Sequence, residues 1–165
     1  MLSAMLTFTP TRTDDESAAL LLRRYFTERE QTFPSAQGAY TVNLPDPSRF
    51  VPPAGDFVVA ALDGVPVGCG GVRSIEDAPG TGDRPVVRFE IKHLYLDADA
   101  RGRGAGRALL AELERRAAAL GAERLVLDTN ESLTAAGNLY RTSGYVETVP
   151  YNDNPNATHW YAKDV

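Results

Sequence analysis

The chain has 165 residues, which matches one domain and leaves too little length for a second. Hydrophobic residues make up 43% and charged residues 24%, so the chain can build a packed core and is not a disordered tail. The net charge of −5 argues against a protein that binds nucleic acid through phosphate contacts, and it favours a cationic small molecule only mildly.

The single cysteine, Cys69, cannot form an internal disulfide, and no run of about 18 apolar residues is present to span a membrane. The first ten residues lack the basic segment and apolar run of a secretion signal. We therefore expect a cytoplasmic protein with neither a membrane nor a nucleic-acid partner. The two histidines, His93 and His159, are isolated in the sequence, so no metal site is expected.

The first part of the chain predicts a strand, a helix and a long loop. Residues 6–9 alternate and precede a proline, which predicts a short strand. Thr13 and Glu16 have the spacing of a capping box, which predicts a helix over residues 14–30. Residues 33–53 hold five of the eleven prolines and show no periodicity, so they are expected to form a long structured loop.

A hairpin and a long strand are predicted next. Residues 56–62 and 65–75 flank Asp63-Gly64, which is a strong two-residue turn signal. Three glycines in the second of these strands should weaken or bulge it. Residues 85–96 alternate over the longest stretch of the chain and predict the longest strand.

Helices and strands alternate in the second half. A helix is predicted to end at Leu120, and a strand follows at residues 124–128. Another helix is predicted at residues 132–143, and final strands at 145–149 and 158–163. An antiparallel first half followed by this alternation predicts a mixed sheet with helices on both faces.

Residues 101–106 form the glycine-rich turn Arg-Gly-Arg-Gly-Ala-Gly between a predicted strand and a predicted helix. Small residues let the backbone approach an anion, and the free amides at a helix start point toward it. The dinucleotide fingerprint does not fit, because its third glycine would fall on Arg107 or Leu109, and the ATP-type Gly-Lys-Ser/Thr is absent. The turn therefore predicts an anion site of another kind, with a flexible basic turn as the alternative.

Two segments resemble the signatures of one family. Residues 90–96, Glu-Ile-Lys-His-Leu-Tyr-Leu, followed by residues 101–110, resemble the acetyl-coenzyme A motif of the GNAT superfamily of N-acetyltransferases. Residues 138–145 resemble that superfamily's second signature, with Tyr145 in place of the common Phe. The resemblance covers roughly residue 57 to the C-terminus.

The resemblance implies an α/β (α+β) fold with a mixed, mostly antiparallel sheet of about six to seven strands and helices on both faces. It implies a single domain over residues 1–165, in which residues 1–5 are expected to be a disordered start. We expect a monomer or a homodimer.

The resemblance also implies that acetyl-CoA is the cosubstrate and that no metal takes part. The backbone of residues 101–107 would bind the pyrophosphate, and residues 94–96 would pair with the pantetheine. The amide of Leu94 would then face the thioester carbonyl. The coenzyme-binding residues implied in this way are Leu94, Tyr95, Leu96, Arg101, Gly102, Arg103, Gly104, Ala105, Gly106, Arg107 and Asn138.

Acetyl transfer to an amine needs a base for the amine and an acid for the departing thiolate. The resemblance makes Glu90 the candidate base, acting directly or through a water; the alternative is a solvated ladder of Arg88, Glu90 and Lys92. It makes Tyr140 the candidate acid, since a phenol of pKa about 10 can protonate a thiolate of pKa about 8.5; the alternative is a core tyrosine.

The leading interpretation is an N-acetyltransferase that acts on a primary amine of a small molecule or peptide by direct attack in a ternary complex. The alternative is a non-catalytic acyl-CoA-binding or regulatory module. Residues 33–53 and 151–155 are expected either to wall the acceptor pocket or to be plain surface loops. His93 and Cys69 are expected to be interior residues rather than reactive ones.

Overall fold

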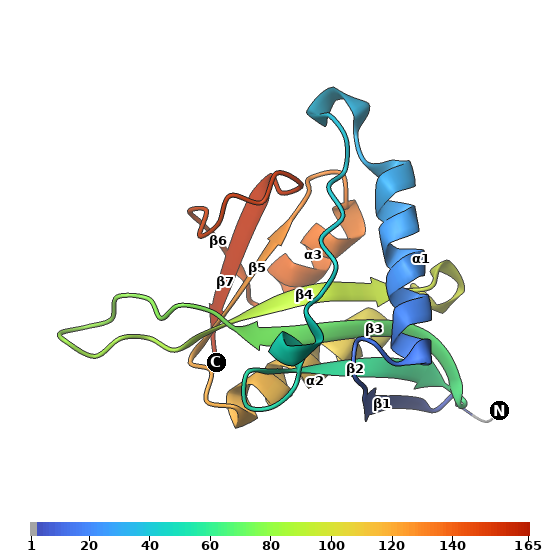
Figure 1. Cartoon of the computed structure of the whole chain (residues 1–165), viewed down its shortest axis with the longest axis horizontal. Helices are drawn as coiled ribbons and strands as arrows, with labels where there is room; N and C mark the ends of the chain where they lie inside the picture. Colours follow the sequence, from blue (N-terminus) through green and yellow to red (C-terminus); the bar gives the residue numbers. More distant parts are fainter. Residues whose placement is uncertain (1–2) are drawn as a thin grey trace.

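Seven strands form one sheet in the computed structural model, which describes residues 3–165 (Figure 1). Their order is β1-β2-β3-β4-β5-β7-β6, and only β4 and β5 run parallel. The predicted mixed, mostly antiparallel sheet is confirmed. The strands are β1 (Leu6–Pro10), β2 (Gly55–Leu62), β3 (Val65–Ser74), β4 (Arg88–Leu96), β5 (Arg124–Thr129), β6 (Val146–Thr148) and β7 (His159–Asp164).

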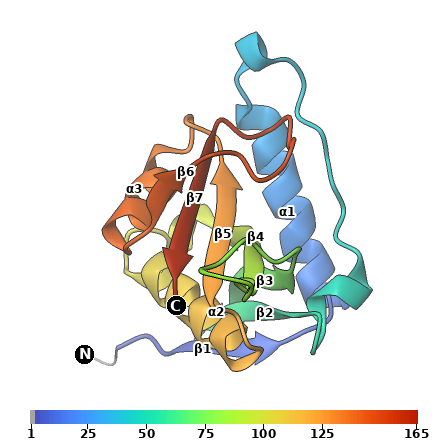
Figure 2. The same ribbon diagram turned by 90° about the vertical axis from the view of Figure 1, so that its left-hand side faces the viewer.

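Helices cover both faces of the sheet, as predicted (Figures 1 and 2). They are α1 (Glu16–Thr32), α2 (Ala105–Ala119) and α3 (Thr134–Thr142), with short 3-10 turns η1 (Ser35–Gln37), η2 (Pro47–Phe50) and η3 (Ala98–Ala100). The leucines of α2 pack with β2 to β5 and with three tyrosines of the C-terminal third in one core. The apolar stripe of α1 packs with η2 and the opposite sheet face in a second core. The sheet is thus buried on both sides, which explains the apolar runs at residues 57–62 of β2 and 125–127 of β5.

The predicted capping box at the start of α1 is wrong. The helix begins at Glu16, and Asp15 precedes it without a side-chain cap hydrogen bond. The Asp15 amide instead bonds to the Arg12 carbonyl at 3.1 Å in a turn, which leaves Thr13 two positions before the cap. The Thr13 hydroxyl is buried and has no hydrogen-bond partner among residues 3–165.

The β2–β3 hairpin turns at Asp63 and Gly64, both with positive φ, as predicted. The register of β3 shifts against both of its neighbours: Val67, next to Gly68, is the extra residue opposite β2, and opposite Gly70 the extra residue is on β4. A Cβ at Gly70 would lie 2.8 Å from Leu113 of α2, and one at Gly71 would lie 2.7 Å from Phe50 of η2. These glycines therefore let helices approach the sheet closely from both sides.

The segment between α1 and β2 runs back along α1 and meets the β6–β7 connection (Figure 2). Thr41 and Asn156 exchange two hydrogen bonds there, of 2.9 and 2.7 Å.

The start of the chain, residues 1–5, is expected to be disordered, and residues 1–2 of it lie outside the described residues. Met5 exchanges two hydrogen bonds with Asp63.

Candidate functional site

The sheet opens between β4 and β5. The two strands pair only through residues 88–90 and 124–126, although both continue beyond these pairs. A cavity of about 420 Å³ lies where they diverge, lined by residues 91–94 and 127–129 and by parts of α1 and α3. The segments 40–45 and 152–156, together with Arg73, Asn130 and Leu133, complete its walls. Both loops that were predicted as pocket walls or surface loops therefore line a cavity.

A bulge shapes the β4 side of this cavity. Cys69 pairs with Tyr95 and Gly71 with Lys92, so His93 and Leu94 together oppose the single residue Gly70. His93 has a φ of 58°, which is uncommon for a residue other than glycine. Leu94 has no paired residue on β3 or on β5, and it lines the cavity.

The glycine-rich turn takes the conformation that its glycines allow. Gly102 and Gly104 have φ values of 76° and 80°, in the left-handed region, and Gly104 is the N-cap of α2. The Ala108 amide makes the first helical bond, to the Gly104 carbonyl. The amides of residues 105–107 precede that bond and point out of the helix start, as an anion site requires.

The three arginines of this turn do not act as one positive cluster. Arg101 donates to the Leu96 carbonyl at 2.9 Å and to the Glu28 carboxylate at 2.8 Å. Arg107 donates to Thr142 and to a neighbouring serine at the end of α3. Arg103 is exposed. Two of the three guanidinium groups therefore already hold structural contacts within the protein.

Replacing Gly104 by Ala is expected to weaken acetyl-CoA binding by about 5- to 30-fold, since a left-handed L-residue costs roughly 1–2 kcal/mol and the turn would relax away from its anion-binding shape. Gly121→Ala is the matched control: its φ of 100° is also positive, a Cβ there would meet nothing within 4 Å, and the residue lies beyond the far end of α2, away from the glycine-rich turn. Calorimetric titration with coenzyme A measures the effect. Equal affinities of the two variants would contradict a role for the Gly104 conformation.

The candidate acid Tyr140 lies on α3 and lines the cavity. It is buried, and its ring packs against Tyr145 and Tyr161 at 6.0 and 6.2 Å. Burial, and secondarily the charge of Asp128, raises the pKa of Tyr140, so its hydroxyl stays protonated at neutral pH. Asn138, in contrast, is exposed and accepts a hydrogen bond from Arg141 at 2.6 Å.

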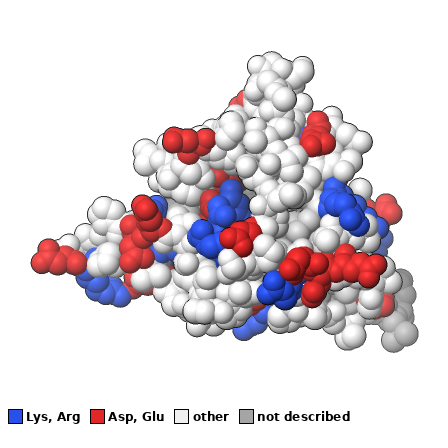
Figure 3. Space-filling view, viewed as in Figure 1, with Lys and Arg blue, Asp and Glu red and all other residues white. Residues whose placement is uncertain are grey.

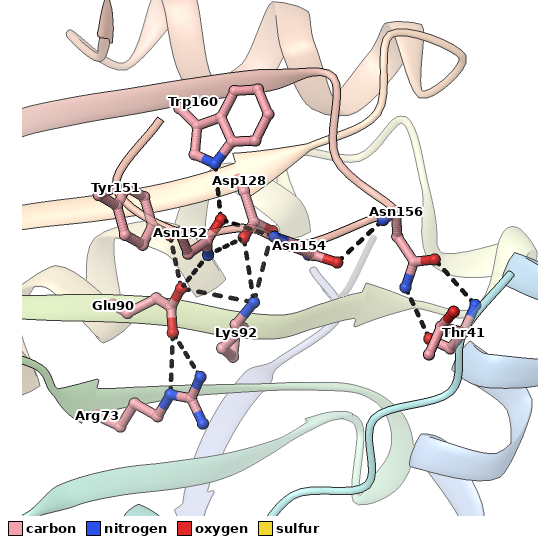
Figure 4. A network of polar contacts seen from close by, with 10 residues as sticks. All are labelled: Thr41, Arg73, Glu90, Lys92, Asp128, Tyr151, Asn152, Asn154, Asn156 and Trp160. Carbon is pink, nitrogen blue, oxygen red and sulfur yellow. Dashed lines mark hydrogen bonds and ion pairs between the residues drawn. The ribbon is translucent and has the colours of Figure 1, made fainter. Parts of the chain in front are cut away.

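The candidate base Glu90 is 1% exposed and lies in a polar network beside the cavity (Figure 4). Its carboxylate accepts from Arg73 Nε at 2.9 Å and from the Tyr151 hydroxyl at 2.6 Å, and it lies 3.5 Å from Lys92 Nζ. The alternative of a solvated ladder is wrong, because the β6–β7 connection covers this part of the sheet. Glu90 does not line the cavity, and its role as the base stays a prediction.

Asp128, which was not predicted, is the carboxylate that lines the cavity. It accepts from Asn152 at 2.7 Å and from Asn154 at 3.1 Å, and it lies 3.3 Å from Lys92 Nζ (Figure 4). Lys92 and Asn152 therefore each contact both carboxylates, with Asn152 Nδ2 3.5 Å from Glu90. The sequence did carry a signal for Asp128. The residue lies at the end of a buried strand, and functional side chains gather where two parallel strands separate at their carboxyl ends.

His93 and Cys69 are interior residues, as expected. The His93 ring lies among Tyr25, Phe26 and Phe50, with centroids 5.6–5.9 Å apart. Burial lowers the pKa of His93 to about 3, so the ring is neutral. Burial also raises the pKa of the Cys69 thiol, which makes a reactive thiolate unfavourable.

Charges on the face seen in Figure 3 are mixed, with positive and negative side chains adjacent near its centre. Within residues 3–165, no group of three or more His, Cys, Asp or Glu side chains could hold a metal ion. None of the helices in this part of the chain has the length and apolar character needed to cross a membrane.

The sequence profile of the Acetyltransferase (GNAT) family matches residues 18–145. The chain is 34% identical to an uncharacterized N-acetyltransferase of Schizosaccharomyces pombe over 68% of its own length and 65% of that protein. It is also 34% identical to the IAA acetyltransferase of Azospirillum brasilense over 58% of its length and 57% of that protein. The matches thus span less than two thirds of these relatives.

Solved structures agree on the fold. A GNAT-family acetyltransferase from Staphylococcus aureus superposes with a TM-score of 0.74 at 14% identity, covering 97% of this chain and 99% of the other. A GNAT-family acetyltransferase from Elizabethkingia anophelis with acetyl-CoA bound superposes with a TM-score of 0.63 at 15% identity, covering 97% and 98%. The profile match over most of the chain shows that this protein belongs to the GNAT acetyltransferase family.

Proposed function

We propose that this protein transfers the acetyl group of acetyl-CoA to a primary amine of a small molecule or peptide by direct attack in a ternary complex. The observation that carries the proposal is the cavity between the diverging strands, which is lined by a protonated tyrosine and a carboxylate. The glycine-rich turn at the start of α2 offers the anion site that the coenzyme's pyrophosphate requires.

Acetyl-CoA supplies an activated acetyl thioester. The backbone of residues 102–106 would hold its pyrophosphate, and β4 would align the pantetheine arm along residues 94–96. The amide of Leu94, which neither neighbouring strand pairs, would donate to the thioester carbonyl oxygen. A donor aimed at charge that develops in the transition state contributes about 2.7–4 kcal/mol.

The acceptor must lose a proton before it attacks. An alkyl amine of pKa about 10.4 is neutral in only about one molecule in 2,500 at pH 7, so a base is needed. In this proposal Asp128, which faces the cavity, takes the proton. Glu90 helps to hold Lys92 and Asn152, and these two residues in turn position the Asp128 carboxylate. The second role open to Glu90 is to receive the proton through a water. Tyr140 gives a proton to the departing thiolate.

A thiol-release assay over a panel of amines tests the activity. We expect release of free coenzyme A with at least one acceptor. Protection against thermal unfolding by acetyl-CoA, without thiol release for any amine, would instead favour the non-catalytic acyl-CoA-binding module.

Replacing Glu90 by Gln is expected to lower turnover by about 2- to 160-fold, the range that couplings of about 0.5–3 kcal/mol between contacting residues produce, and to shift its pH dependence. Glu114→Gln is the matched control, because the Glu114 carboxylate also contacts a tyrosine hydroxyl and a lysine, each at 3.0 Å, away from the cavity. Steady-state rates from pH 6 to 10 measure the effect. An unchanged rate and pH profile in Glu90→Gln would remove Glu90 from the mechanism.

A further inference from the structure

Arg29 is a buried cation in the wall of the cavity. It lies in α1, is 5% exposed, and belongs to the cavity lining. Its guanidinium carbon lies 5.2 Å from the centroid of the Tyr40 ring and 5.8 Å from that of Phe33. Its Nη1 atom is buried and has no hydrogen-bond partner among residues 3–165.

The other charged groups of the cavity wall are all held in ion pairs. Arg73 is bound to Glu90 at 2.8 Å, and Lys92 lies between Glu90 and Asp128. Arg29 makes no ion pair within the described part of the chain. The cavity wall therefore has one positive charge that pairs with no carboxylate of residues 3–165.

The acidic residues nearest to Arg29 in the sequence are turned away from it. Glu28 binds Arg101 at 2.8 Å, and Glu30 is exposed. Burial of a charge with an unsatisfied donor is unfavourable unless a partner completes it. Binding sites hold such strained groups because the ligand supplies the missing partner.

If the proposed acetyl transfer is correct, we propose that its acceptor is an amino-carboxylate whose carboxylate binds Arg29, such as a free amino acid or a short peptide. A single unpaired guanidinium matches one negative charge, whereas a phosphate group carries about −1.5 to −2. The aromatic walls formed by Tyr25, Phe26 and Tyr40 suit an apolar or aromatic acceptor body. This local excess of positive charge reverses the mild preference for cationic acceptors that the net charge of −5 suggests.

The test compares matched pairs of acceptors: the standard L-amino acids and their glycine dipeptides, each as the free acid and as the carboxamide. The native protein is expected to prefer the free acids by about 10- to 100-fold in kcat/KM, as measured by thiol release. Arg29→Met keeps the apolar stem and should abolish this preference by lowering the rates of the free acids far more than those of the carboxamides. Arg29→Lys should restore part of it. Arg23→Met removes a charge from an exposed position of the same helix outside the cavity and should retain the preference.

Two further readouts separate binding from packing and from turnover. Arg29→Met should not lower the unfolding temperature, because it removes an unpaired buried charge; a lower temperature with an unchanged acid preference would reduce Arg29 to a packing role and overturn the proposal. Calorimetric binding of the free acids to the coenzyme A-loaded protein needs no chemistry. If the free acids bind to the native protein but not to Arg29→Met, the anion site is supported even when no thiol is released and the proposed acetyl transfer fails. Equal binding of acids and carboxamides, or no binding of any acid, would overturn it.

Discussion

Replacement of Tyr140 by Phe is expected to lower kcat by about 10²–10⁴-fold, the usual contribution of a positioned general acid. The ring and its packing against Tyr145 and Tyr161 are retained, so the unfolding temperature and the KM for acetyl-CoA should change little. Because burial raises the pKa of Tyr140, the native hydroxyl keeps its proton throughout the neutral range, while the same shift makes it a weaker acid than an exposed tyrosine. Steady-state thiol release together with thermal unfolding measures both effects.

Tyr145→Phe is the matched control from the same aromatic cluster. Tyr145 is equally buried, but its hydroxyl donates to Glu114 at 3.0 Å, and the residue does not line the cavity. Its loss should cost about 1 kcal/mol of stability and leave turnover unchanged. Full turnover in Tyr140→Phe, or an equal loss of turnover in the two variants, would leave Tyr140 with a packing role only.

Local patterns were sufficient to predict most of the architecture. Asp63-Gly64 predicted the hairpin because its two residues can adopt the positive φ values that the turn needs. The glycine-rich turn and the α2 helix were predictable because their conformation depends on neighbours in sequence. Thr13 and Glu16 failed as a capping box although their spacing was correct, since a turn held by the Arg12 carbonyl set the helix start instead.

The site was predictable only in part, because its polar groups come from distant segments. Glu90 and Lys92 could be placed on one strand, but the residues that bury them, Tyr151 and Asn152, arrive some 60 positions later in the chain. Alternation alone indicated a solvated face for Glu90, where the structure has a buried ion-pair network.

Arg29 shows a second limit of sequence patterns. Its position on α1 fits the buried face of an amphipathic helix, yet a charged residue there has no recognisable meaning until its surroundings are known. Only the structure shows that aromatic rings flank the guanidinium and that no carboxylate within residues 3–165 pairs with it. The net charge is a sum over the whole chain, so it does not give the sign of the charge inside one cavity.

Replacement of Asp128 by Asn is expected to lower kcat/KM for the amine by about 10²–10⁴-fold at neutral pH, because Asn keeps the size of the side chain but cannot take a proton. The loss should shrink about tenfold for each unit that the pH rises toward the amine pKa of about 10.4, since more of the acceptor is then already neutral. Thiol-release rates from pH 6 to 10 measure this slope. Asp56→Asn is the matched control, because Asp56 is also a mostly buried, ion-paired aspartate, 2.9 Å from Arg116, but lies outside the cavity lining.

The comparison of Asp128→Asn with Glu90→Gln decides which carboxylate takes the proton. Asp128 lines the cavity and Glu90 does not, so the larger rate loss and the recovery at high pH should belong to Asp128→Asn. A native rate in Asp128→Asn with a large loss in Glu90→Gln would assign the proton to Glu90 acting through a water. The double variant should lose less than the product of the two single losses, because both carboxylates act through the same Lys92 and Asn152 contacts.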